Sequence, residues 1–156
     1  MFKISRFSFG GTAAIVTNMA LIIGLNAASA TRPTIISSLL IVALADNLTD
    51  SLSIHIYQES ERLEPKAAFR VTVANFLARL AVSLIFVLFV LLLPMPVATV
   101  VSLLWGTLLL LSISMVIAHD RGVSMVRECA KHVVAALLVI VVSQAVGAWI
   151  PRLLHR

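Results

Sequence analysis

The chain has 156 residues, of which 60% are hydrophobic and 12% are charged, and its mean hydropathy is +1.06. A water-soluble domain of this size has too little interior to hide so much apolar surface, so an ordinary soluble globular protein is excluded. The single cysteine, Cys129, excludes an intrachain disulfide and a cysteine-based metal cluster. The net charge of +5 comes from basic residues between apolar segments, where they act as topology signals rather than nucleic-acid contacts.

Five apolar segments follow one another along the chain, each close to the roughly 20 residues that a helix needs to cross a bilayer. Pro33 suits the first turn of the second segment, and Leu93-Pro94-Met95-Pro96 predicts a tight turn after the third. Pro151 marks the end of the fifth. The sequence therefore predicts an all-α polytopic membrane protein with a single transmembrane domain over residues 1–156. The predicted helices are residues 10–28, 33–56, 67–93, 97–118 and 132–150.

The start of the chain also fits a second interpretation. Lys3 and Arg6, an apolar stretch and then Ala28-Ser29-Ala30 resemble a secretory signal peptide with its cleavage site. Against this, the apolar stretch is long and is interrupted by Asn18. Cleavage would leave four helices with the same orientation.

Basic residues orient the predicted bundle. Five spans place eight lysines and arginines on one side and three on the other, with Arg79 left out because it lies within the third span. Since cytoplasmic loops carry the excess of basic residues, we expect the N-terminus in the cytoplasm and the C-terminus on the far side. The eight are Lys3, Arg6, Arg62, Lys66, Arg70, Arg121, Arg127 and Lys131, and the three are Arg32, Arg152 and Arg156.

The second segment carries ionisable residues at bilayer depth, where they usually serve a function or have a partner. Asp46, Asp50, Ser53 and Tyr57 are spaced to lie on one helical stripe. Two carboxylates one turn apart can share a divalent cation or a proton, which relieves the repulsion between like charges.

Partners for these carboxylates lie at matching depths in the third segment. At about 1.5 Å per residue, Asp46 lies about 15 Å from the cytoplasmic end of its helix, and Arg79 lies about 12 Å deep when counted inward from Val71. Antiparallel packing of the two segments predicts an Asp46–Arg79 pair and, one turn nearer the cytoplasm, an Asp50–Asn75 pair. The predicted metal or proton ligands are Asp46, Asp50, Asn18, Ser53 and Asn75. The alternative is a purely structural role, as interhelical hydrogen bonds or a buried ion pair.

Other polar residues favour no chemistry of their own. His55 faces away from the aspartate stripe, and His119 ends the fourth segment. Neither histidine has a second metal-binding residue at the sequence spacing that metal sites use. The chain lacks a nucleophile elbow, a glycine-rich phosphate loop and a zinc-protease motif. We therefore expect neither an enzyme nor a bound cofactor.

Several stretches resemble the vacuolar iron transporter-like family. They are residues 17–28 (TNMALIIGLNAA), 57–61 (YQESE), 64–68 (EPKAA) and the last segment, from Met125-Val126-Arg127-Glu128 to Val146-Gly147-Ala148-Trp149-Ile150. The resemblance implies a homodimer that exports divalent iron or manganese from the cytoplasm by proton exchange. The chain departs from the family pattern at three positions. The family aspartate near Ala13 and the glutamate near Val42 are absent, and Asp50 stands where the family has a methionine. The large cytoplasmic metal-collecting domain is also absent.

The sequence thus predicts an exporter of a divalent cation, with Asp50 as the one metal position that the resemblance carries over. The competing hypothesis is a non-transporting subunit that anchors or stabilises a larger membrane complex. The expected partners are the lipid bilayer and either a second copy or other subunits, and the expected location is the bacterial inner membrane.

Overall fold

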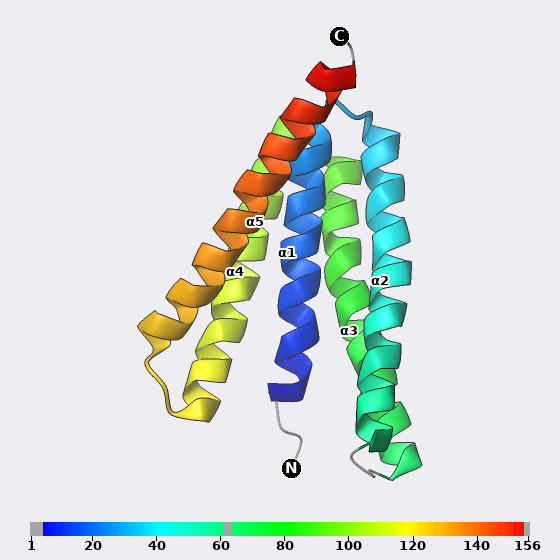
Figure 1. The fold of residues 1–156 in the computed structure, drawn as a ribbon, viewed down its shortest axis with the longest axis vertical. Helices are drawn as coiled ribbons and strands as arrows, with labels where there is room; N and C mark the ends of the chain where they lie inside the picture. The colour runs from blue at the N-terminus through cyan, green and yellow to red at the C-terminus, as the bar shows by residue number, and fades with distance from the viewer. Residues whose placement is uncertain (1–4, 61–63, 155–156) are drawn as a thin grey trace.

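The computed structural model describes residues 5–60 and 64–154, and in this part of the chain it is a bundle of five helices without strands. Lys3, Arg62 and Arg156, which contribute to the charge count, lie outside the described residues. The helices are α1 (Ser5–Ala27), α2 (Arg32–Ser60), α3 (Pro65–Leu92), α4 (Met95–Arg121) and α5 (Met125–Leu154). Successive helices run in opposite directions, so the start of α1 and the end of α5 lie at opposite ends of the bundle (Figure 1). We call these the N end, where α1 begins, and the C end, where α5 ends.

Four of the helices are long and apolar enough to cross a membrane: α2, α3, α4 and α5. In α1 the described apolar part, Gly11–Ala27, is shorter. Many large apolar side chains face outward along all four long helices, as lipid-facing surface requires. The fold is therefore that of a multi-pass membrane protein.

The helix ends differ from the predicted ones mainly where polar residues flank the apolar runs. α2 continues to Ser60, and α5 begins at Met125, where a connection was expected up to Lys131. Pro151 lies inside α5, which ends at Leu154. The length of an apolar run gives the part of a helix that lies in lipid. The helix itself extends beyond that run because the flanking polar residues also favour helix formation.

Helix α1 lies at the centre of the bundle and packs against each of the other four helices (Figure 1). Toward the C end its Ile22 joins Ile35, Leu39, Phe86 and Val90, all fully buried, in an apolar layer. Its Met19 lies against Gly106 of α4, where a Cβ would collide with the Met19 side chain. The residues on the buried face of α4 are spaced four apart, and all of them except Leu110 are small. The small side chains let α1 approach α4 closely. This face comprises Ala98, Ser102, Gly106, Leu110, Ser114 and Ala118.

Two contacts close the C end. The Arg32 guanidinium donates a hydrogen bond to the carbonyl oxygen of Leu93, which joins the α1–α2 connection to the α3–α4 connection. Helices α1 and α5 cross at Gly24 and Gly147, where a Cβ on Gly147 would overlap the Gly24 carbonyl oxygen. Small residues at this crossing allow the two backbones to touch.

Candidate functional site

Arg79 is the largest fully buried side chain of the described residues, with 1% of its surface exposed. Its Nε donates to Asn47 Oδ1 at 2.8 Å, and its Nη2 donates to Asp46 Oδ2 at 3.2 Å. Its Nη1 donates to Asp50 Oδ2. We call these four residues, Asp46, Asn47, Asp50 and Arg79, the arginine cluster.

The arginine cluster follows from helical geometry. Asp46 and Asp50 lie one turn apart on α2, Asn47 follows Asp46 directly on the more buried side, and a guanidinium presents five donors in a fixed planar fork. One arginine on α3 can therefore satisfy three side chains at once. A charge is tolerated at this depth because every guanidinium nitrogen has an acceptor.

The two carboxylates lie at the flank of the α2–α3 pair rather than in its interior. The side chains of Asp46 and Asp50 are 44% and 41% exposed, while that of Arg79 is 1% exposed. The cluster combines two negative groups with one positive group. When both acids are ionised it therefore carries one uncompensated negative charge on a surface that would otherwise meet lipid.

The pair predicted between Asp46 and Arg79 is present, but the second predicted pair is not. Asp50 also contacts Arg79, and the only side-chain donor of Asn75, Nδ2, has no partner among the described residues. Asp50 turns toward the cation because a charged hydrogen bond is stronger than one to a neutral amide.

The structure does not bring the other predicted ligands to the carboxylates. Asn18 Nδ2 donates to the Ala14 carbonyl oxygen at 2.7 Å and to Ser83 Oγ at 3.0 Å. Ser53 is exposed and donates to the Thr49 carbonyl oxygen at 3.0 Å. The described residues hold no group of three or more histidine, cysteine, aspartate or glutamate side chains that could bind a metal. Among the described residues, the carboxylate oxygens available at the cluster are those of Asp46 and Asp50.

Sequence reasoning missed a second polar stripe on α2. Asn47, Ser51 and Gln58 are at most 2% exposed and face the bundle interior, on a different side of the helix from the aspartate stripe. Their spacing of four and seven residues was the available signal. His55, on the same helix, contacts Thr72 Oγ1 through Nδ1 at 3.4 Å.

A second polar contact joins α4 to α5 toward the N end. Ser114 Oγ lies 2.9 Å from His132 Nδ1 and 2.6 Å from the Leu110 carbonyl oxygen. Since one hydroxyl has one proton, Ser114 donates to Leu110 when the imidazole donates to Ser114. One turn before His132, Glu128 forms ion pairs with Lys131 at 3.1 Å and Arg121 at 3.7 Å.

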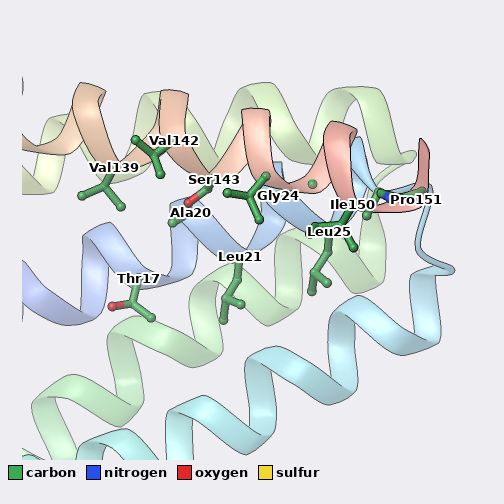
Figure 2. A pocket seen from close by; sticks show the side chains of 13 residues that line it. Thr17, Ala20, Leu21, Gly24, Leu25, Val139, Val142, Ser143, Ile150 and Pro151 are labelled. Atoms are coloured by element: carbon green, nitrogen blue, oxygen red, sulfur yellow. The ribbon is translucent and has the colours of Figure 1, made fainter. Parts of the chain in front are cut away.

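An apolar groove of about 610 Å³ lies between α1 and α5 beside the Gly24–Gly147 crossing (Figure 2). Thr17 and Ser143 supply the only side-chain hydroxyls of its lining, and no charged residue lines it. The groove can hold an apolar chain but offers no ligand set for an ion. The arginine cluster is therefore the candidate functional site.

No family model, no curated protein and no solved structure matches this chain.

Proposed function

We propose that this chain is a multi-pass membrane transporter that exports a divalent cation of the iron or manganese type from the cytoplasm in exchange for protons. Asp46 and Asp50 would bind the cation or the proton. The observation that carries the proposal is that two half-exposed carboxylates, one turn apart, share a single buried guanidinium. The resemblance of the sequence to the vacuolar iron transporter-like family supports the same function.

Charge supports an exchange mechanism. The arginine cluster has one more negative than positive group, and an uncompensated charge in lipid is costly, so the cluster favours binding a proton or a cation. Carboxylate oxygens favour hard ions such as Mn²⁺, Fe²⁺ and Mg²⁺. The positive charge of Arg79 weakens the binding of a cation by the same two carboxylates, which favours release of the cation.

The same argument leads us to propose a partner subunit. Asp46 and Asp50 face outward from α2 in the single chain, and a second copy or another subunit would cover them. A second copy would also bring two further carboxylates toward a shared ion. We propose a homodimer, in the inner membrane of a bacterium.

The proposed topology places the N end of the bundle in the cytoplasm. The support is the count of eight basic residues against three, together with chain ends at opposite ends of the bundle (Figure 1). Reporter fusions after Arg62 and after Arg156 should fall on opposite sides of the membrane. Finding both reporters on the same side would overturn the topology.

The transport proposal is tested with purified protein in lipid vesicles. We expect uptake of at least one of Mn²⁺, Fe²⁺, Co²⁺ and Zn²⁺, with proton movement in the opposite direction. Asp50→Asn should abolish this flux while keeping the protein folded, and Asp120→Asn, which changes an exposed acid at the end of α4, should keep it. The absence of flux for all four ions would contradict the proposal.

A second candidate is a non-transporting membrane subunit that has kept the fold. It is favoured by Arg79, which already engages both acids, and by the absence of a third acid, histidine or cysteine beside them in the described residues. This function predicts stable co-purification with a different protein and no phenotype for Asp50→Asn. Mass spectrometry of the detergent-extracted complex distinguishes it from a homodimer.

A further inference from the structure

The contacts between α2 and α3 define how the two helices are aligned. Asn47 meets Arg79, and His55 meets Thr72. In an antiparallel pair, residue numbers rise along one helix and fall along the other, so the numbers of two contacting residues add up to a nearly constant value. That value is 126 for Asn47–Arg79 and 127 for His55–Thr72. The same alignment places Ser51 of α2 opposite Asn75 of α3.

Polar side chains therefore occur at about every turn of this interface, from Gln58 near the N end to Arg79. Counted at about 1.5 Å per residue from the helix ends, Gln58 lies about 3 Å deep, the His55–Thr72 contact about 10 Å, and the Ser51 level about 14 Å. Arg79 lies about 21 Å deep. Beyond it, toward the C end, the Asn18–Ser83 bond is followed by the apolar layer.

Several of these side chains are buried but have atoms without a protein partner. Gln58 Oε1, Ser51 Oγ, Asn75 Nδ2 and Asn47 Nδ2 make no hydrogen bond to any described residue, and each residue is at most 2% exposed. Ser51 and Asn75 lie at the same level of the interface in this alignment, and Ser51 Oγ and Asn75 Nδ2 each lack a hydrogen-bond partner. Buried polar groups of this kind are nearly always paired, and where protein does not pair them, water does.

We propose that the α2–α3 interface holds a column of water that leads from Gln58 at the N end to Arg79 and Asp50. The column supplies the missing partners of Gln58, Ser51, Asn75 and Asn47. It ends at the apolar layer, which closes the interface toward the C end. Water and hydrated protons, and small cations that can replace a water molecule, reach the carboxylates from one end of the bundle only.

The water column rests on the proposed transport function only for the claim that ions travel along it to the carboxylates. The column itself is tested without measuring flux. In a Cys129→Ser background, Ser51→Cys and Ala43→Cys place a thiol on the same buried stripe of α2, on either side of Arg79. The two native residues are equally buried, at 2% and 1% exposed. Purified protein is exposed to Ag⁺, which is small enough to follow water, and the remaining free thiol is counted by mass spectrometry.

We expect Ag⁺ to block Ser51→Cys faster than Ala43→Cys by about an order of magnitude or more, because ions enter apolar interiors only with difficulty. Equal rates of thiol blocking at the two positions would contradict the proposed water column. Asn75→Cys, on the facing helix, should react with Ag⁺ as fast as Ser51→Cys does. It replaces Ser51→Cys in the comparison with Ala43→Cys if the Ser51→Cys protein aggregates. A fast reaction in a protein without metal flux would reject the transport proposal and retain the column.

Discussion

The Nε atom of Arg79 donates a hydrogen bond to Asn47 Oδ1 at 2.8 Å across the α2–α3 interface. This bond uses the guanidinium edge that the two aspartates leave free. It orients the planar group so that both Nη atoms point toward the α2 flank, where Asp46 and Asp50 accept their hydrogen bonds. The neutral Asn47 thus determines where the positive charge of Arg79 is placed.

Removing the guanidinium should destabilise the protein strongly. Arg79→Met leaves the half-exposed Asp46 and Asp50 without their cation on a surface that meets lipid, and a charge at bilayer depth costs about 2.5–3.5 kcal/mol. Adding Asp46→Asn and Asp50→Asn to Arg79→Met should recover much of the loss, because no unpaired charge remains. Thermal denaturation in detergent gives the apparent Tm of each variant. Arg70→Met, which changes an exposed arginine of the same helix, is the control, and strictly additive losses would mean that the charges are not coupled.

Removing Asn47 should have a smaller effect of the same kind. Asn47→Leu leaves Arg79 Nε without its acceptor in a buried position, at a cost of about 1–3 kcal/mol. The apparent Tm should fall below that of Thr49→Leu, which alters an exposed residue two positions along. In an Arg79→Met background the Asn47→Leu substitution should lose most of its effect. An unchanged effect there would show that Asn47 acts on stability by another route.

The bond between Asn18 and Ser83 should couple α1 to α3 measurably but weakly. Hydrogen bonds between transmembrane helices average about 0.6 kcal/mol in double-mutant cycles. Asn18→Leu and Ser83→Ala, alone and together, should give a coupling of about that size from apparent unfolding free energies. Asn18→Leu with Ser102→Ala is the control pair, because the Ser102 hydroxyl makes no hydrogen bond to Asn18. A coupling no larger than that of the control would mean that the bond does not contribute.

Enlarging Gly147 should separate α1 from α5. A Cβ at this position would overlap the Gly24 carbonyl oxygen, so Gly147→Ala forces the backbones apart, at an expected cost of about 1–3 kcal/mol for overpacking. Gly11→Ala is the control, since a Cβ there lies 3.4 Å from the Ile113 side chain, an ordinary contact. The apparent Tm in detergent should fall for Gly147→Ala and stay nearly constant for Gly11→Ala. Equal values for the two variants would contradict a close crossing.

The sequence predicts the five helices because the length of an apolar run translates directly into a crossing segment. It also places Asp46 beside Arg79, since depth in two antiparallel helices follows from counting residues. It does not predict which side of each helix faces the bundle, because lipid-facing and buried surfaces are equally apolar. The central place of α1 and its crossing with α5 therefore appear only in the structure.

The site was harder to predict than the fold. The aspartate stripe was visible, but an arginine side chain is long enough to reach two turns of a neighbouring helix, so Asp50 and Asn75 did not pair. Asn18 was expected near the carboxylates from its depth alone, whereas its partner Ser83 depends on the lateral order of the helices. Counting residues gives the position of a side chain along the bundle axis only. Predicting a set of ligands also requires the lateral position of each helix and the direction in which each side chain points.

The Gly24–Gly147 crossing has a mechanical consequence. Helix α5 touches α1 there and diverges from it toward the N end, where it starts at Met125 (Figure 1). The distance along α5 from Gly147 to Met125 is about 33 Å at 1.5 Å per residue. A rotation of about 5° around the crossing would move the start of α5 by about 3 Å over that length. Because the crossing lies near the C end of α5, a small rotation about it would displace the start of that helix the most, where Ser114–His132 and Arg121–Glu128 are the contacts that would resist it.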